Sequence, residues 1–400
     1  MDAPIREADT ANPFAAARRN FRAAQDWTYL NVGSRGIVSA AARQAAVDAV
    51  DGHFLVDRPK EQFQPLLDAC RAGFATIVGG LPDEVAVAEN TSGGLNAIAT
   101  AIDWKQGDNV VLSADLEHAN NVYLWHVLKG RGVEVRTVPP TGTEIDANAL
   151  AAAIDRRTRV VTAASVTFTP GFRTDLAVIG KAARAADALF LVDGVQSCGV
   201  LELDAGASLV DAVATSTSKG LLGLMGLGFL WVRSDWIGRL TPTRVARTAI
   251  ATSGHYSEME GTDFTFAPTA TRFEVGSPNW VGIAAAAQAM AEINAIGVPS
   301  IERHALALAE ALRGELQALG LPVQRPREAR SLSHLVTVGE RNAGNAYSTS
   351  DATLNRLAAA LQDARVRFSI RRGLIRFGLH LYNDASDVAK VVDVARGVLR

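Results

Sequence analysis

The chain has 400 residues, of which 48% are hydrophobic and 20% charged, a globular composition that excludes disordered and fibrous proteins. Its 40 basic and 42 acidic side chains give a formal charge of −2, without the basic excess of a nucleic-acid-binding protein. The length favours one large domain with a smaller partner. We therefore expect no nucleic acid among the main partners.

The cysteines and the apolar segments exclude further classes. Cys70 and Cys198 are the two cysteines and form no CxxC motif, so neither a disulfide scaffold nor a zinc ribbon is expected, and no metal site is predicted. The first 25 residues are broken by charges, unlike a secretory signal. The most apolar stretch, 221–232, is too short to span a bilayer. We expect a cytoplasmic protein without a membrane partner.

From about residue 84, short apolar runs alternate with segments of helical periodicity. The runs EVAVAEN, NVVLSA, VEVRTV, RVVTAASV and ALFLVD are rich in β-branched residues and bounded by turn residues. This alternation predicts parallel strands with helical crossovers, and hence a doubly wound, mainly parallel α/β sheet. Two further strands, 211–215 and 228–232, extend it. A TIM barrel would show similar alternation, but the glycine-rich run between the last two strands fits it poorly.

The pattern changes near residue 280, where long amphipathic helices begin. Beyond them we predict a strand at 333–338, a helix at 351–361, a hairpin at 367–378 and a helix at 385–399. These elements would form a smaller C-terminal α+β domain. The predicted division is an N-terminal arm of residues 1–30 that joins the small domain, a large domain of residues 31–280 and a small domain of residues 281–400.

Two charged residues follow strands of the predicted sheet, where ligands of open α/β sheets bind. Asp193 follows the apolar strand 188–192 and could pair with a cationic ligand atom, although a helix cap would explain it equally well. Lys219 lies between small hydroxyl residues and Gly-Leu-Leu-Gly. Apolar neighbours lower the pKa of a lysine and make it a nucleophile for Schiff-base formation. A lysine that only binds an anion is the alternative.

Two other strand ends add a candidate phosphate site and a histidine. The turn 90–94 offers backbone N–H groups, two hydroxyls and two glycines at a helix start, although an ordinary cap has the same letters. His118 follows the strand 109–113 and could stack on a planar ligand or move a proton, although a lone histidine is more often structural. An amine, a carboxylate and a phosphate cup are together what pyridoxal 5'-phosphate (PLP) requires.

Several sequence runs carry a resemblance to a known family. They are YLNVGSRGIVS from Tyr29, DGVQSCG from Asp193, STSKGLLG around Lys219, VGSPNW from Val275 and RFGLHLYN from Arg376. With these runs the chain resembles, over nearly its whole length, the class V aminotransferases of the fold-type I PLP-dependent enzymes. This group includes cysteine desulfurases, isopenicillin N epimerase and kynureninase-like enzymes. The resemblance implies PLP as the cofactor and a homodimer with shared active sites.

The resemblance also implies a role for individual residues. Lys219 would carry the internal aldimine, Asp193 would pair with the pyridine nitrogen, and His118 would stack on the ring. Arg376 would bind the α-carboxylate of an amino acid substrate bidentately, and Asn31 would close over it. The remaining cofactor contacts would be Gln196 to the phenolic oxygen, Thr91, Ser92, Gly93, Ser216 and Ser218 to the phosphate, and Ser277 to the phosphate of the partner subunit.

Three departures from the family pattern bear on the reaction. Many relatives have a histidine where this chain has Ser218, and desulfurases tend to have an asparagine near Phe168. No cysteine follows Cys198, whereas desulfurases accept sulfur on a loop cysteine in the C-terminal region. Persulfide transfer is therefore not supported.

These features predict an enzyme that acts at the α-carbon of an amino acid through an aldimine and a quinonoid. A class V aminotransferase is the first prediction, and a β-eliminating, C–S lyase-like enzyme or an epimerase is the alternative on the same fold. A non-catalytic protein that binds PLP or a phosphate ligand is the alternative from another class. A nicotinamide-dependent dehydrogenase would need G-x-G-x-x-G after the first strand, and the chain lacks it.

An arginine cluster suggests something of the substrate. Arg367, Arg371, Arg372 and Arg376 crowd the predicted hairpin beside the expected carboxylate site. We hypothesise that the substrate carries a second anionic or polar group. A solvated hairpin edge explains every arginine except Arg376 equally well.

Overall fold

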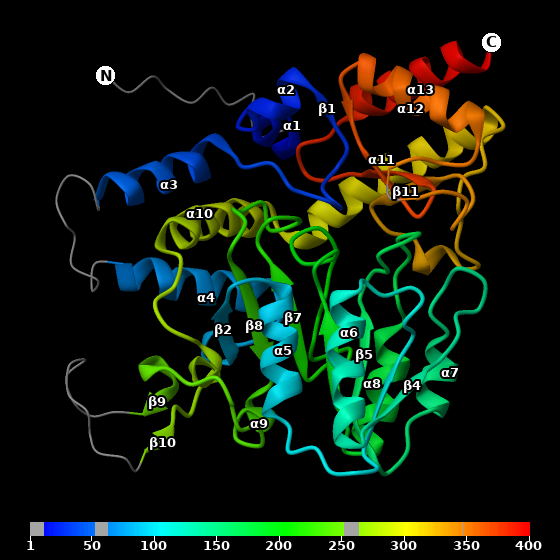
Figure 1. Ribbon diagram of the computed structural model, residues 1–400. Coiled ribbons are helices and arrows are strands. Elements are labelled where there is room, and N and C mark those ends of the chain that lie inside the picture. Colours follow the sequence, from blue (N-terminus) through cyan, green and yellow to red (C-terminus); the bar gives the residue numbers. More distant parts are fainter. Residues whose placement is uncertain (1–11, 53–62, 252–263, 346) are drawn as a thin grey trace.

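The computed structural model describes residues 12–52, 63–251, 264–345 and 347–400 (Figure 1). Residues 1–11 of the expected N-terminal arm lie outside this range. In the described chain, a seven-stranded sheet forms the centre of the large part, and a three-stranded sheet forms the centre of the C-terminal part. Figure 1 shows the second sheet and its helices above the first.

The large sheet is mainly parallel, as predicted. Its strand order is β2-β8-β7-β6-β5-β3-β4, and β8 runs antiparallel to both of its neighbours while the other pairs are parallel. The strands are β2 (Val85–Ala88), β3 (Asn109–Leu112), β4 (Glu134–Thr137), β5 (Thr158–Ala164), β6 (Leu189–Asp193), β7 (Ala212–Ser216) and β8 (Gly228–Val232).

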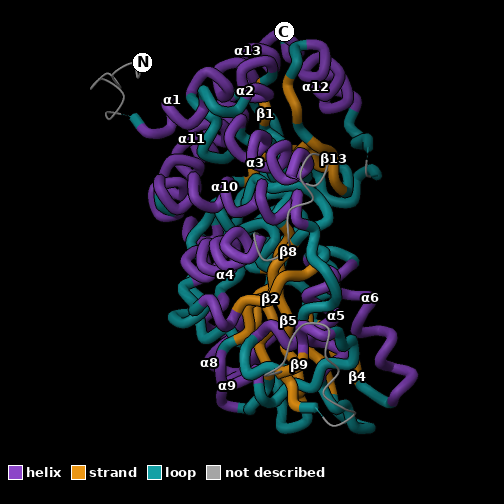
Figure 2. Tube along the Cα trace, turned by 90° about the vertical axis from the view of Figure 1, so that its left-hand side faces the viewer, coloured by secondary structure: helices purple, strands orange, loops and turns teal. Residues whose placement is uncertain are grey.

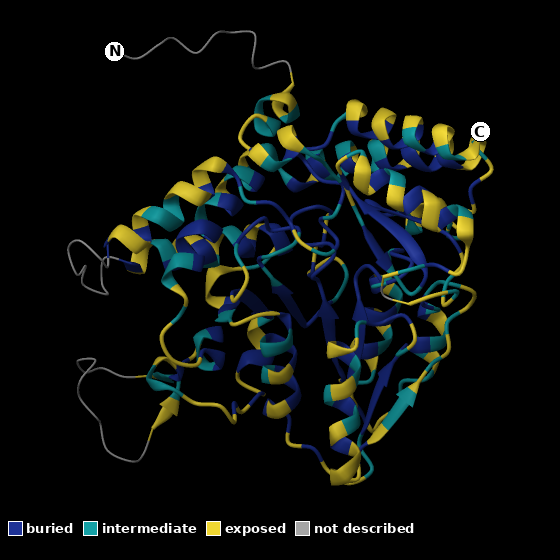
Figure 3. Cartoon of the chain, turned by 45° about the horizontal axis from the view of Figure 1, so that its top comes forward, coloured by how far each residue is buried: buried dark blue, intermediate teal, exposed yellow. Residues whose placement is uncertain are grey.

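Both faces of the central strands of this sheet are buried, which explains why these strands read as continuous apolar runs, whereas the edge strand β4 is partly exposed. Along β6, Phe190 and Val192 belong to one hydrophobic core, whereas Leu189 and Leu191 belong to another. The first core includes side chains of α4 (Gln64–Val78), α8 (Leu176–Ala185) and α10 (Trp280–Ile296), and the second includes side chains of α5 (Thr91–Ala101) and α6 (Asn120–Val127). Figure 3 shows the buried strands between helices whose outer faces are exposed.

The remaining elements of the large part are short or peripheral. Helix α3 packs on α10, and the antiparallel pair of β9 and β10 flanks residues 252–263, which lie outside the described chain. The bounds are α3 (Ala40–Asp51), α7 (Ala147–Ala152), α9 (Ser234–Ile237), β9 (Ile250–Ala251) and β10 (Thr265–Phe266).

The C-terminal part is an α+β unit, as the sequence predicts. Its sheet is antiparallel with the order β11-β14-β13, where β11 is Leu335–Val338, β14 is Leu374–Gly378 and β13 is Ser369–Arg371. The helices packed with it are α11 (Val298–Ala318), α12 (Ala352–Asp363) and α13 (Ala385–Leu399). Figure 2 shows these helices at the end of the molecule away from the large sheet.

The N-terminal segment lies against this C-terminal unit. Strand β1 (Thr28–Tyr29) pairs in parallel with β12 (Val366–Arg367). Before it, α1 (Pro13–Arg18) ends at Arg18, whose Nη1 donates to Asp387 Oδ2 at 2.7 Å, and α2 (Arg22–Asp26) follows. Asp387 is buried in α13, so this ion pair fixes α1 to the C-terminal unit.

Packing partners change within α11, later than the predicted boundary near residue 281: Ala305 belongs to the core that contains α4, α8 and α10, whereas Ala309 belongs to the core of the small sheet. Helix α10 packs on α3 and α4 of the large part, whereas α11 packs on α13 and β11. The helical pattern continues across this point, so the sequence alone cannot show the change. No single described helix is long and apolar enough to cross a membrane; α10 and α11 qualify only as a pair, with a bend of 79° between them.

Arg313 offers a test of how α11 is attached to the small sheet. Its side chain is 1% exposed, and its Nη2 donates to the carbonyl oxygens of Ser333 and Leu335 at 2.6 Å each. We expect Arg313→Met to lower the free energy of unfolding by about 2–4 kcal/mol, because two buried carbonyls lose a charged donor. Chemical denaturation measures this change. Arg303→Met, at an exposed position of the same helix, is the control; an equal effect of both variants would contradict the assignment.

Candidate active site

The carboxyl ends of the central strands bring the predicted residues together. Asp193 is the last residue of β6 and is in register with Ala164 of β5 and Ala214 of β7. Lys219 follows β7 after a turn, and His118 lies between β3 and α6. The strand-end placement of all three therefore agrees with the sequence prediction.

Asp193 and Lys219 form a buried electrostatic pair without direct contact. Burial raises the pKa of Asp193. Two effects oppose this shift: the backbone N–H of Val195, which donates to Oδ1 at 3.0 Å, and the charge of Lys219. Burial lowers the pKa of Lys219 to about 8. The negative charge of Asp193 opposes this shift, and the positive charge of Arg376 adds to it. Within the described chain, Lys219 has no carboxylate inside the 4.0 Å ion-pair limit. The amine is therefore deprotonated more easily than that of an ordinary lysine and is not tied to an acid.

His118 is a neutral ring beside this pair. Its ring packs edge-to-face on Phe168, with centroids 5.0 Å apart, and its Nδ1 accepts the backbone N–H of Asn120 at 3.2 Å. Burial lowers the pKa of His118, and the charges of Lys219 and Arg376 lower it further. A neutral imidazole with one nitrogen occupied is suited to packing against a planar ligand.

The turn before α5 is a helix cap, and a residue outside the turn donates a hydrogen bond to the hydroxyl group of Ser92. Asn90 is the N-cap, and its Oδ1 accepts the N–H of Gly93 at 3.0 Å, so this N–H already has a partner within the turn. Asn120 Nδ2 donates to Ser92 Oγ at 2.7 Å. Asn120 thus connects the predicted phosphate turn to His118.

The other predicted phosphate contacts lie at the same edge of the sheet. Thr91 is buried at the first turn of α5. Ser216 ends β7, and its Oγ lies 3.4 Å from that of Ser218. The segment between β7 and Lys219 therefore presents two neighbouring hydroxyls, and the role of these residues at a phosphate stays a prediction.

Residues 31–36 run across the site and approach it through glycines. The N–H of Gly36 donates to the carbonyl of Ser218 at 2.8 Å, and a Cβ at Gly36 would lie 2.2 Å from the carbonyl oxygen of Lys219. Gln196 Nε2 donates to the carbonyl of Gly33 at 2.9 Å. This segment therefore packs directly on the backbone of the candidate catalytic lysine.

Arg376 of β14 is a buried cation with free donors. Its Nε donates to Ser369 Oγ at 3.3 Å, its Nη1 to the carbonyl of Phe168 at 2.9 Å and its Nη2 to Ser34 Oγ at 3.1 Å. Three of the five guanidinium donors are thus used, and one remains on each terminal nitrogen. Burial lowers the pKa of Arg376 to about 9, which leaves it charged at neutral pH. Two free donors suit a bidentate carboxylate.

The site meets the requirements of PLP. Gln196 Oε1 and Asn31 Oδ1 are buried polar atoms without a hydrogen-bond partner, and the Asp193 carboxylate is buried without an ion-pair partner among the described residues. A ring nitrogen that carries a proton would neutralise Asp193, and the amine of Lys219 would bind an aldehyde. Asn31 also pairs through its backbone with Gly378, at the end of the strand that carries Arg376.

The sequence assigned no role to His380, which joins the small domain to this site. Its Nδ1 accepts the N–H of Leu381 at 2.6 Å, and its Nε2–H donates to the carbonyl of Gly220 at 2.8 Å. Burial lowers the pKa of His380 to about 4, so the ring stays neutral and keeps this arrangement. Ser34, Asn120 and His380 were missed, although each lies within four residues of a predicted site residue, and Ser34 and His380 stand in runs that carry the family resemblance.

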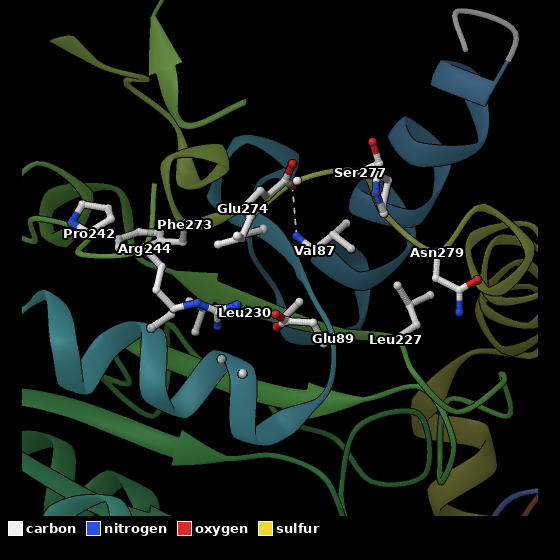
Figure 4. Close-up of a pocket in the computed structure, with 18 of the residues that line it drawn as sticks. Val87, Glu89, Leu227, Leu230, Pro242, Arg244, Phe273, Glu274, Ser277 and Asn279 are labelled. Atoms are coloured by element: carbon white, nitrogen blue, oxygen red, sulfur yellow. Dashed lines mark hydrogen bonds and ion pairs between the residues drawn. The ribbon is translucent and has the colours of Figure 1, made fainter. Parts of the chain in front are cut away.

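Ser277 lies apart from Lys219 in the same chain. It is exposed and lines a hollow with Glu89, Gly93 and Asn279 (Figure 4). Neither Lys219 nor Asp193 nor Arg376 lines this hollow, and Arg244 pairs there with Glu89 at 2.7 Å. The predicted contact of Ser277 with a partner's phosphate stays a prediction.

Neither cysteine is available as a sulfur acceptor. Cys70 and Cys198 are both buried, and burial raises the pKa of each thiol to about 12. The chain has no other cysteine. This agrees with the expectation that Cys198 does not take part in persulfide transfer.

Among curated proteins, the chain is similar to cysteine desulfurases and to aminotransferases. It is 30% identical over 254 residues to a probable cysteine desulfurase of Methanothermobacter thermautotrophicus; the match covers 63% of this chain and only 62% of that protein. It is 25% identical over 377 residues to an uncharacterised aminotransferase of Bacillus subtilis, covering 94% and 95% of the two chains.

Solved structures confirm the fold. A cysteine desulfurase of Thermococcus onnurineus NA1 aligns over 100% of this chain and 99% of its own, with a TM-score of 0.82 and 21% identity. A cystine C–S lyase in complex with cysteine persulfide aligns over 94% and 99% of the two chains, with a TM-score of 0.81 and 23% identity.

The family itself is fixed by a match that runs through both parts of the molecule. Residues 38–391 match the family Aminotransferase class-V. This range contains every strand-end residue of the site, from the turn before α5 to Arg376. The chain therefore belongs to the class V aminotransferase family of fold-type I PLP-dependent enzymes.

Proposed function

We propose that the protein is a PLP-dependent enzyme that acts at the α-carbon of an amino acid, and first of all an aminotransferase. The observation that carries this proposal is the buried amine of Lys219, which has no ion-pair partner in the described chain. Burial lowers its pKa to about 8; the negative charge of Asp193 opposes this shift, and the positive charge of Arg376 adds to it. A lysine that served only to bind an anion would gain nothing from a lowered pKa.

The residues of the chain divide the work. When bound, PLP withdraws electrons from the bonds at the α-carbon of the attached amino acid. Asp193 keeps a proton on the ring nitrogen, because its buried carboxylate favours a cation beside it. The two free donors of Arg376 hold the α-carboxylate, and the amine of Lys219, once released by the substrate, takes and returns the α-proton.

β-Elimination is the second candidate, supported by the similarity to desulfurases and to a cystine C–S lyase. Because neither cysteine is accessible, a lyase built on this site would release its sulfur product directly instead of storing it on a thiol. Epimerisation uses the same α-proton and differs only in the face to which the proton returns.

A panel of amino acids added to the holoenzyme separates these reactions. We expect a keto acid and the amine form of the cofactor, with turnover only when a keto acid acceptor is supplied. Ammonia and a thiol without an acceptor would indicate the lyase, and inversion of the amino acid the epimerase. Lys219→Ala is expected to lower the rate about 10²–10⁴-fold, because it removes the base. Lys181→Ala, at an exposed lysine, is the control; equal rates in both variants would contradict the role of Lys219.

The pH dependence of cofactor capture tests the state of the amine. Because the neutral amine is the nucleophile and its pKa is about 8, the rate of Schiff-base formation should rise about tenfold per pH unit below pH 8 and level off above it. Asp193 raises this pKa, so Asp193→Asn should move the midpoint to lower pH. Stopped-flow absorbance with added PLP measures both curves. A midpoint near 10.5, the ordinary lysine value, would contradict the burial of the amine.

We also propose that the protein is a homodimer in which Ser277 reaches the partner's site. The position of Ser277 on an exposed hollow away from Lys219 of its own chain supports this proposal. Ser277→Ala subunits mixed with Lys219→Ala subunits should form some sites with both residues intact, and so recover cofactor retention and activity above either variant alone. Equal values before and after mixing would contradict shared sites.

A further inference from the structure

The structure distinguishes the four arginines of the C-terminal hairpin. The guanidinium of Arg367 lies over the ring of Trp27, 4.6 Å from its centroid. Arg372 donates to the carbonyl of Asp115 at 2.6 Å and pairs with its carboxylate at 3.5 Å. These two arginines therefore have partners of their own. Within the described chain, Arg371 and Arg376 have no carboxylate inside the 4.0 Å ion-pair limit.

Arg371 and Arg376 are held side by side by one hydroxyl group. Each donates from its Nη2 to Ser34 Oγ at 3.1 Å, so these two nitrogens are at most twice 3.1 Å apart. Arg371 also donates from Nη1 to the carbonyl of Ile370 at 2.7 Å. Three of its five donors remain, and it is half-buried rather than solvated. Its charge lowers the pKa of both Lys219 and His118, which places it on the same side as the reacting amine.

Two cations this close, and partly removed from water, repel each other. The α-carboxylate of an amino acid neutralises one of them, and the other keeps its charge and its unused donors. A second anionic group on the same molecule would neutralise both.

On the basis of the proposed function, we propose that the substrate is a short dicarboxylic α-amino acid, whose side-chain carboxylate is bound by Arg371 while Arg376 binds the α-carboxylate. The carboxylate is planar and matches the guanidinium fork, and Ser34 sets the spacing between the two cations. Arg371 thereby determines specificity, whereas Lys219, Asp193 and Arg376 serve any amino acid substrate.

The test uses carboxylates that cannot react, because they lack an amine. Succinate and butyrate have the same number of carbon atoms and differ by one carboxylate. We expect calorimetric titration of the holoenzyme to show that succinate binds about 10- to 100-fold more tightly than butyrate. Arg371→Gln should remove this preference and leave the affinity for butyrate unchanged. Arg372→Gln, its neighbour in sequence with a partner elsewhere, should keep the preference.

Two outcomes would overturn the proposal. If Arg371→Gln weakens butyrate as much as succinate, both arginines hold one carboxylate. If the unmodified enzyme has no preference for succinate, no second anionic site exists. Should Arg371→Gln fail to fold, Arg371→Lys keeps the charge without the fork and is expected to lose most of the preference. Failure of the proposed function is seen separately: preferential binding of succinate without conversion of any amino acid would leave Arg371 assigned and refute the aminotransferase.

Discussion

The site depends on keeping the amine of Lys219 buried, with a lowered pKa and without a direct ion pair among the described residues. Burial acts against its positive charge, Asp193 acts for it, and Arg376 and Arg371 act against it. A direct ion pair with Asp193 would fix the ammonium form and occupy the carboxylate. Because the two groups influence each other at a distance instead, both remain available to a ligand that lies between them.

The fold produces this balance through the edge of one sheet. Strands β5 and β6 end at the paired residues Ala164 and Asp193, and β7 continues past Ala214 to Ser216, so Asp193 and the segment that leads to Lys219 lie at the same edge of the sheet. The C-terminal unit supplies the cations from β13 and β14, and the glycines of residues 31–36 let a third segment pass between the two parts. The candidate site residues thus come from segments far apart in the chain and from both sheets.

The sequence predicted much of this, because its signals were local. Buried strands give continuous apolar runs, and β8 begins and ends at the residues predicted from such a run. Asp193 and Lys219 were found because a charged residue next to a buried strand is conspicuous. The distinction between Arg371 and Arg372 could not be predicted, since it depends on which side of the hairpin faces Ser34 and which faces Asp115. The sequence also could not show that the N–H of Gly93 donates to Asn90 Oδ1 within the same turn, because this depends on the local backbone geometry.

The hydrogen bond from His380 to Gly220 has a mechanical consequence. One end belongs to the C-terminal unit, and the other is the carbonyl of Gly220, the residue that follows the candidate catalytic lysine. A rotation of that unit toward a bound amino acid would therefore pull on the backbone of Lys219 as well as bring the arginines closer. The ligand would then be bound more tightly and the amine repositioned in a single movement, coupled through the His380 ring, which stays neutral throughout.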